Sequence, residues 1–327
     1  MRNCGGKRRY FFLAVNTGFT TNGEPDSRCR QFYQTRSGNG LHCAIVGNVV
    51  VPQGGATNDV CAEISESNAW RELVAAITNN GALAGIQLSS TWQGYQGSKR
   101  FVPRAGESPL TEYRNFGASI SKQQVVDAFD SLQRGTELAV KAGFRHIQLH
   151  AAHGYLFNIL VDNRLSPYAN FAFRLICRWA EALASEKVET SIRFSMCSGD
   201  VIFDREHSLE LSNEIAQLPV NYVDVSAGFY NINKRLIYPS TTAHLEERAA
   251  GTLGIAARHP MQNFIMSGKS VGAWDTSLPS NVHIGICRDL IANPNYLADR
   301  TDGCAICMKC HYFSRGEKHL VCGQWSK

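Results

Sequence analysis

The chain has 327 residues, of which 44% are hydrophobic and 19% charged, a balance that supports a sizeable core and excludes the highly charged, weakly hydrophobic class of disordered proteins. Its 33 Lys and Arg against 28 Asp and Glu give a formal charge of +5, which is small for this length and not gathered into a long basic run, so nucleic-acid binding is disfavoured. No stretch approaches the roughly 18 uncharged apolar residues of a membrane span and no signal peptide is evident, so the sequence predicts a cytoplasmic protein without a membrane segment.

Eight apolar, β-rich runs recur along the chain and are the predicted strands. They cover residues 10–15, 44–51, 83–88, 146–151, 190–196, 222–226, 263–267 and 281–287. Stretches with helical period lie between most of them, most clearly at 123–142 and 171–184. Strands that alternate with helices are typically parallel, and eight repeats is the number that closes a (β/α)8 TIM barrel. A doubly wound open sheet is the alternative that the pattern leaves open.

The chain divides near residue 302, after the last predicted helix of the barrel. Residues 1–302 are predicted to form the barrel and residues 303–327 a short C-terminal cysteine-rich extension. The chain has 11 cysteines, an odd number in a large sequence without an export signal, which is not typical of a disulfide framework. Four of them, Cys304, Cys307, Cys310 and Cys322, crowd this extension.

Polar residues gather at the ends of the predicted strands, where a TIM barrel carries its chemistry. They are Thr17 after the first strand, Gln87 in the third, His150, His153 and Tyr155 at the fourth, Arg193 in the fifth, Gly268 after the seventh and Arg288 after the eighth. Each has a structural explanation when taken alone. Together they bring amides, imidazoles, a phenol and guanidiniums to one mouth, which suits a large, planar, anionic cofactor with a phosphate. The two histidines are three positions apart with no glutamate between them, unlike the helical zinc pair of a metalloprotease.

Five of these strand ends resemble motifs of one family. The run LHAAHGYLFN at 149–158 resembles the HxxHGYLxN motif of the Old Yellow Enzyme family of FMN-dependent reductases. Four further stretches match in the same order: FLAVNTG at 12–18 the family's first strand, GIQL at 85–88 its glutamine strand, IRFS at 192–195 its arginine strand, and ICRDLIANP at 286–294 its GRxxIANP phosphate strand. The resemblance covers about residues 9–300 and implies an FMN-binding barrel that reduces an electron-poor carbon–carbon double bond.

The resemblance implies which residues hold the cofactor. Gln87 and Arg193 would bond the polar edge of the isoalloxazine ring, where Arg193 would stabilise the negative charge of the reduced flavin. Thr17 would approach the flavin O4 region and tune the reduction potential. The Gly268 backbone and the Arg288 guanidinium would hold the phosphate.

The resemblance also implies catalytic roles. His150 and His153 would hydrogen-bond the activating carbonyl of the substrate, while hydride from flavin N5 reaches one carbon of the double bond and Tyr155 protonates the other. Segment 161–170 departs from the family's long NxRxDxYGG segment, so the substrate stays open. Flavin-dependent amine oxidation or desaturation is the enzymatic alternative. A flavin-free, zinc-stapled barrel that serves as a binding or scaffold protein is the alternative of another class.

The tail cysteines have the spacing C-x2-C-x2-C-x11-C, in which four thiolates hold either a zinc ion or an iron–sulfur cluster. Spacing alone leaves the two nearly even. A cluster of similar spacing follows the barrel in the branch of the family that resembles 2,4-dienoyl-CoA reductase and trimethylamine dehydrogenase. The resemblance therefore implies a 4Fe–4S cluster, and His311 beside Cys310 is expected to be solvated rather than a ligand.

The source of electrons stays open in the sequence. The chain has no G-x-G-x-x-G fingerprint after a strand, so no dinucleotide-binding domain is predicted. The sequence leaves three alternatives. In the first, NAD(P)H reduces the FMN directly; in the second, a separate ferredoxin or flavoprotein reduces it through the cluster; in the third, the cluster is only structural. The expected substrate is a small unsaturated molecule. The sequence does not distinguish between a monomer and a homo-oligomer.

Overall fold

The computed structural model describes residues 7–97, 99, 101–102, 107–206, 208–268 and 278–325. Eight parallel strands follow the order β1-β11-β10-β9-β8-β7-β6-β4, and pairing between β1 and β4 closes them into a barrel. They are β1 (Tyr10–Phe12), β4 (Cys43–Val50), β6 (Leu83–Ser89), β7 (His146–Ala151), β8 (Glu189–Ser195), β9 (Tyr222–Ser226), β10 (Asn263–Met266) and β11 (Val282–Ile286). The (β/α)8 TIM barrel is confirmed, and the open-sheet alternative is wrong.

The first strand differs most from its prediction. β1 ends at Phe12, although residues 10–15 were predicted to be extended. The amide of Leu13 still donates to the carbonyl of Ile286 at 2.8 Å, but the next residues leave the ladder to line a cavity. The short edge strand β5 (Ala62–Glu63) pairs with β4, and a hairpin of β2 (Thr20–Thr21) and β3 (Glu24–Pro25) follows β1.

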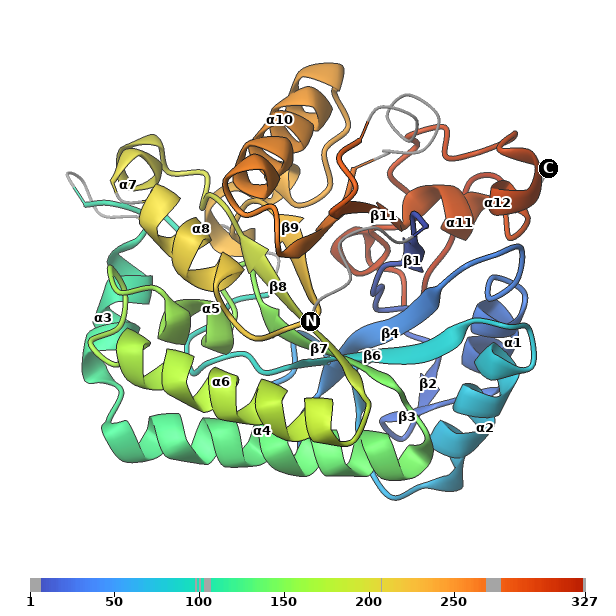
Figure 1. Cartoon of the computed structure of the whole chain (residues 1–327), viewed down its shortest axis with the longest axis horizontal. Helices are drawn as coiled ribbons and strands as arrows, with labels where there is room; N and C mark the ends of the chain where they lie inside the picture. The colour runs from blue at the N-terminus through green and yellow to red at the C-terminus, as the bar shows by residue number, and fades with distance from the viewer. Residues whose placement is uncertain are drawn as a thin grey trace.

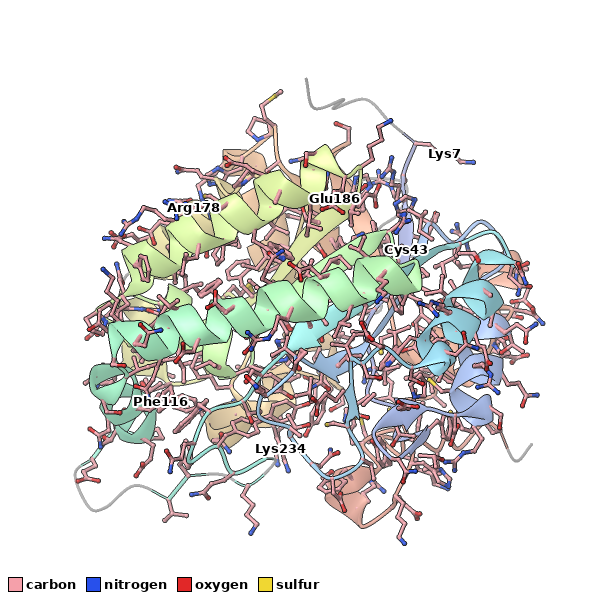
Figure 2. The ribbon with its side chains drawn as sticks, turned by 90° about the horizontal axis from the view of Figure 1, so that it is seen from below. Lys7, Cys43, Phe116, Arg178, Glu186 and Lys234 are labelled. Atoms are coloured by element: carbon pink, nitrogen blue, oxygen red, sulfur yellow. The ribbon has the colours of Figure 1, made fainter. Side chains whose placement is uncertain are left out.

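Helices cover the outside of the barrel between successive strands (Figure 1). The longer ones are α1 (Ser27–Gln34), α2 (Asn68–Thr78), α3 (Thr111–Ser119), α4 (Lys122–Ala142), α6 (Ala169–Ser185), α8 (Ser208–Ala216) and α10 (Thr242–Arg258). The shorter ones are α5 (Leu156–Val161), α7 (Val201–Arg205), α9 (Tyr230–Asn233), α11 (Arg288–Ala292), α12 (Tyr296–Asp299), η1 (Lys234–Leu236) and η2 (Phe313–Arg315). Figure 2 shows α4 and α6, the two clearest sequence predictions, side by side on the outer surface. None of the helices that the structure describes combines the length and the apolarity needed to cross a membrane.

Local signals in the sequence set the bounds of α4. The Ser121 hydroxyl accepts from the amide of Gln124 at 3.2 Å, and the Gln124 side chain accepts from the amide of Ser121 at 2.8 Å, which forms a capping box. The helix ends at Gly143, whose φ of 108° is the left-handed conformation that glycine adopts without strain. Phe129 and Leu132 are buried on the face toward the sheet. The helix is therefore fixed at both ends and along one face.

A charged cluster lies at the N-terminal ends of the strands, opposite the mouth. Glu189 Oε2 is 2.9 Å from His42 Nε2 and 3.3 Å from His146 Nδ1. Arg9 donates to Glu189 Oε1 at 2.8 Å and also to the hydroxyl of Tyr222. Burial alone would raise the pKa of Glu189, but the hydrogen bonds from His146 and His42 outweigh it and hold this pKa well below its ordinary value.

Glu189→Gln is expected to lower the free energy of unfolding at pH 7 by about 1–3 kcal/mol, because charge-assisted hydrogen bonds to a partly buried carboxylate are lost. A depressed pKa stabilises the folded state fully above the unfolded value of about 4.5 and less as the pH falls below it. The difference from the wild type should therefore shrink below pH 4.5 in urea denaturation. Glu66→Gln, which breaks an exposed pair with Lys141 at 2.8 Å, is the control with little expected effect. An equal difference at pH 3 and pH 7 would contradict the assignment.

The C-terminal extension packs against the barrel. Leu320 is fully buried, and its amide donates to the carbonyl of Thr17 at 2.7 Å. Trp325 Nε1 donates to the carbonyl of Ile291 in α11 at 2.8 Å. Residues 303–325 thus lie at the end of β1 and beside α11. The division of the chain at residue 302 stays a prediction.

Candidate cofactor and substrate site

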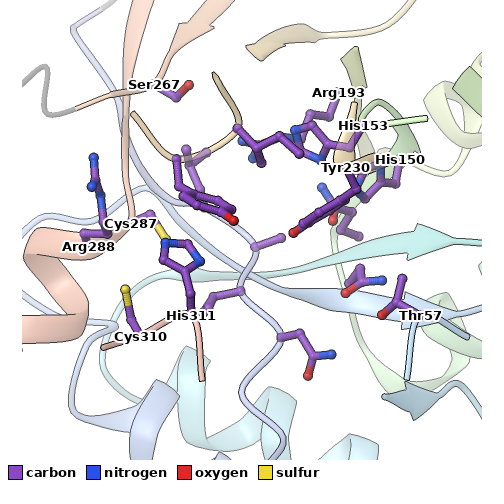
Figure 3. A pocket seen from close by; sticks show the side chains of 18 of the residues that line it. Thr57, His150, His153, Arg193, Tyr230, Ser267, Cys287, Arg288, Cys310 and His311 are labelled. Carbon is purple, nitrogen blue, oxygen red and sulfur yellow. The ribbon is translucent and has the colours of Figure 1, made fainter. Parts of the chain in front are cut away.

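A cavity lies at the C-terminal ends of the barrel strands, and the extension forms part of its wall (Figure 3). Seven of the residues predicted at strand ends line it: Gln87, His150, His153, Tyr155, Arg193, Gly268 and Arg288. Thr17 is not among the lining residues. Its hydroxyl accepts from the amide of Phe19 at 3.2 Å, and its neighbours Val15 and Asn16 line the cavity instead.

One wall of the cavity is a buried polar network around Arg193. Arg193 Nη1 pairs with Asp224 Oδ2 at 3.1 Å, and Nη2 donates to Ser226 Oγ at 3.4 Å. Gln87 Nε2 donates to Gln148 Oε1 at 2.6 Å, and Gln148 Nε2 donates to Asp224 Oδ2 at 3.3 Å. Arg193 Nε is buried without a hydrogen-bond partner in the part of the chain described. Buried donors are normally satisfied, so this unpaired donor, in a residue that lines the cavity, lacks an acceptor that the described residues do not supply.

The turn after β7 is built to present its side chains to the cavity. His153 and Gly154 have φ values of 64° and 79°, so the chain reverses through the left-handed region. A Cβ on Gly154 would lie 2.5 Å from the hydroxyl of Tyr113, which requires glycine there. The side-chain oxygen of Asn158 accepts from the amide of Gly154 at 2.9 Å, and Trp92 Nε1 donates to the carbonyl of Gly154 at 2.9 Å. The glycine and asparagine of the motif are therefore structural.

The histidines and the tyrosine of this turn lie together. The rings of His150 and Tyr155 stack with centroids 4.3 Å apart, and the rings of His150 and His153 are 5.0 Å apart. His150 Nδ1 accepts from the amide of Ala152 at 3.3 Å, which places the proton of a neutral ring on Nε2. His153 Nε2 is 2.8 Å from Ser226 Oγ. Two imidazoles and a phenol thus share one wall of the cavity.

Burial sets the protonation of this group. It lowers the pKa of His150 to about 3, with a contribution from Arg193, and lowers the pKa of His153 well below its ordinary value. Burial also raises the pKa of Tyr155 well above 10. At neutral pH both imidazoles are uncharged hydrogen-bond donors, and Tyr155 keeps its proton.

The opposite end of the cavity carries guanidiniums and a loop glycine. Gly268, with φ of 102°, follows Ser267 at the end of β10. Arg288 Nη2 donates to the carbonyl of Pro239 at 2.6 Å. Arg248 of α10 reaches the same end, where its Nη1 donates to Ser267 Oγ at 3.3 Å. Cationic donors beside a loop glycine suit an anionic group.

Several lining residues were missed by sequence reasoning. Arg248 lies within a helix rather than at a strand end, and its only signal was a charge at a core position of the helical period. Tyr230 and Tyr238 follow β9, which offered no motif. His311, predicted to be solvated, is only partly exposed: its Nε2 is buried without a partner among the described residues, and its ring centroid is 3.6 Å from that of Tyr238.

The four tail cysteines lie in a loop of tight turns. Ile306 and Met308, between the first three cysteines, have φ values of 57° and 59°. Cys304 Sγ accepts from the amide of Ile306 at 3.3 Å. Cys310 lines the cavity, and burial raises its pKa to about 12, with neighbouring Cys287 and Cys304 adding to the shift. Within the described ranges, no group of three or more His, Cys, Asp or Glu is arranged to hold a metal ion.

Comparison with known proteins points to one family. The model of a family described as NADH:flavin oxidoreductase / NADH oxidase matches residues 11–303. A NADPH dehydrogenase of Geobacillus thermodenitrificans is 35% identical over 103 residues, which are 30% of this chain and 28% of that protein. A NADPH dehydrogenase of Clostridium acetobutylicum is 27% identical over 147 residues, 42% of this chain and 41% of that protein. The NADH-dependent flavin oxidoreductase iliE of Hypocrea jecorina is 22% identical over 321 residues, 83% of this chain and 79% of that protein. The matches to the two dehydrogenases thus span less than half of each.

Proposed function

The chain belongs to the NADH:flavin oxidoreductase / NADH oxidase family, and from this premise we propose that it is an FMN-dependent oxidoreductase that uses NAD(P)H to reduce an electron-poor carbon–carbon double bond in a small molecule. The observation that carries the proposal is the meeting, in one cavity, of the unpartnered Nε of Arg193 with a neutral His150 stacked on a protonated Tyr155. The charged guanidinium of Arg193 suits the polar edge of a flavin. The neutral His150 suits a carbonyl oxygen of the substrate, and the protonated Tyr155 suits a carbon that accepts a proton.

The residues present fit FMN at both ends of the cavity. Gln87 and Arg193 would hold the polar edge of the ring, because both are fixed by the network through Asp224. Gly268 and Arg288 would hold the phosphate. When bound, FMN supplies the hydride, after its own reduction by NAD(P)H.

The protein supplies orientation and the proton. His150, with its proton on Nε2, and His153 are proposed to donate to the activating carbonyl of the substrate and so draw electrons from the double bond. Tyr155 is proposed to give its phenolic proton to the carbon next to that carbonyl. The raised pKa of Tyr155 keeps the phenol protonated at neutral pH, so that the proton is present when the substrate carbon is protonated.

The test is an anaerobic titration of the purified protein. NAD(P)H should bleach the flavin absorption, and an α,β-unsaturated ketone such as cyclohexenone should restore it with formation of the saturated ketone. Amines that bleach the flavin without NAD(P)H would favour amine oxidation instead. A flavin that NAD(P)H reduces but no enone or enoate reoxidises would contradict the proposed reaction.

We also propose that residues 303–327 form a tail that holds a 4Fe–4S cluster at Cys304, Cys307, Cys310 and Cys322. Amide hydrogen bonds to sulfur support this: Ile306 donates to Cys304 Sγ and Gln324 to Cys322 Sγ. The described residues contain no group of three or more His, Cys, Asp or Glu placed to hold a metal ion, so the choice of an iron–sulfur cluster over zinc rests on the resemblance and on these amide hydrogen bonds.

Cys307→Ala is expected to leave FMN bound and to leave its direct reduction by NAD(P)H unchanged. The rate of flavin reduction by a ferredoxin or flavoprotein donor should fall at least 10-fold, because one cluster ligand is lost. Flavin bleaching is followed with each donor in turn. Cys177→Ala, on the outer helix α6, is the matched control. Unchanged reduction by the protein donor would count against an electron path through the tail.

A further inference from the structure

Arg248 is a buried cation with an unused donor. It lies in the middle of α10 and is only 4% exposed. Its Nη1 donates to Ser267 Oγ at 3.3 Å and to the carbonyl of Ile237 at 3.4 Å, and its Nη2 donates to the carbonyl of Leu236. Its Nε is buried without a partner in the described chain. Arg248 therefore lines the cavity while its Nε–H makes no hydrogen bond to the described residues.

Positive charge predominates in the lining of the cavity as a whole. The described lining contains the guanidiniums of Arg193, Arg248 and Arg288 but, among carboxylates, only that of Asp289. Arg193 is paired with Asp224 at 3.1 Å. The charge of Asp224 also acts on Arg248, but none of the described carboxylates forms an ion pair with Arg248. Burial, and next the charge of Arg193, lower the pKa of Arg248 to about 9. A buried charge of this kind is costly unless an anion lies beside it.

The backbone places Arg248 next to the glycine expected at the phosphate. A Cβ added to Gly268 would lie 3.4 Å from Arg248 Cδ, so the glycine backbone rests on the arginine side chain. Arg288 donates to Pro239, two residues beyond the carbonyl of Ile237 that Arg248 contacts. The two guanidiniums thus approach the same segment from two elements, α10 and α11.

We propose that Arg248 is a second phosphate-binding arginine, which acts with Arg288 and makes this site select flavins that carry a terminal phosphate over riboflavin. The inference rests on the proposed function, since it takes FMN as the cofactor. A phosphate carries nearly two negative charges at neutral pH and accepts several hydrogen bonds, which matches two guanidiniums better than one. Arg248 is a positioning and specificity residue, remote from the reacting carbon.

A purely structural role is the competing explanation, because Arg248 also holds the carbonyls of Leu236 and Ile237. The two roles differ in what they do to riboflavin. Loss of a structural tether should weaken FMN and riboflavin alike, since both share the ring site. Loss of a phosphate contact should weaken FMN alone.

The experiment titrates the full chain, freed of flavin by dialysis, with FMN and with riboflavin, and follows the quenching of flavin fluorescence. Arg248→Met is expected to raise the Kd for FMN about 10- to 100-fold and to leave the Kd for riboflavin within about 2-fold. Arg248→Lys keeps the positive charge but not the planar guanidinium, and should give a ratio of the Kd for FMN to the Kd for riboflavin between those of the wild type and Arg248→Met. This variant tests the proposal if Arg248→Met does not fold. Arg145→Met, which removes an exposed arginine that donates to the carbonyls of Val140 and Phe144 away from the cavity, should leave the ratio unchanged.

A parallel fall in the two affinities, or no fall in either, would overturn the role of Arg248 and leave the proposed function intact. A wild-type chain that binds neither flavin would instead contradict the proposed function itself. The two failures are therefore distinguishable in one set of titrations.

Discussion

Tyr155→Phe should leave FMN bound and reducible by NAD(P)H, but slow reoxidation of the flavin by an unsaturated ketone about 100- to 10,000-fold, the range that a positioned general acid supplies. The substitution removes one oxygen from a buried side chain and keeps the ring that stacks on His150 at 4.3 Å. The binding site should thus keep its shape while the proton donor is lost. Stopped-flow absorbance measures the two half-reactions separately.

The control and the pH profile sharpen this prediction. Tyr222→Phe removes the hydroxyl of another buried tyrosine, at the opposite end of the barrel, and should leave both half-reactions unchanged. Burial raises the pKa of Tyr155 well above 10, so the wild-type reoxidation rate should not fall through loss of this proton below about pH 10. Reoxidation at the wild-type rate in Tyr155→Phe would remove the tyrosine from the mechanism.

Arg193→Met is expected to abolish FMN binding and to lower the free energy of unfolding by about 3–5 kcal/mol, because it leaves the carboxylate of Asp224 buried without its cation. Asp224 is fully buried, and burial already raises its pKa, an effect that Arg193 opposes. Without the arginine this pKa rises further above the unfolded value of about 3.8. The loss of stability should therefore be largest at neutral pH and shrink as the pH falls and the carboxyl takes up a proton.

The double variant Arg193→Met/Asp224→Leu separates the two effects. Removal of both charges should restore most of the stability, since apolar replacements of a buried pair are often neutral. FMN binding should not return, because the donor to the ring is still absent. Denaturation and flavin fluorescence measure the two properties on the same samples. Recovery of FMN binding in the double variant would contradict a direct contact between Arg193 and the flavin.

The barrel itself was predictable because each strand carries its own local signal. The runs HIQLHA at 146–151 and YVDVS at 222–226 alternate apolar with polar residues, and both appear in the structure with the predicted limits. β1 is shorter than its apolar run because residues 13–16 leave the ladder to line the cavity. An apolar pattern reports burial, and burial against a cavity and burial against a strand look the same in the sequence.

The site was predictable only where it lies in motifs at strand ends. His150, Tyr155 and Arg193 follow that rule, and all three line the cavity. Asp224 and Arg248 do not follow that rule, because Asp224 lies in the middle of β9 and Arg248 in the middle of α10. Their roles arise from tertiary contacts with Arg193 and Ser267, which no spacing within one element reveals.

The central claim is that this cavity binds FMN, and the most direct measurement is the absorption spectrum of the purified chain together with the flavin released on denaturation. The spectrum should show the yellow absorption of oxidised flavin, and about one FMN per chain should be released. A colourless protein that takes up no FMN when the cofactor is added would contradict the account.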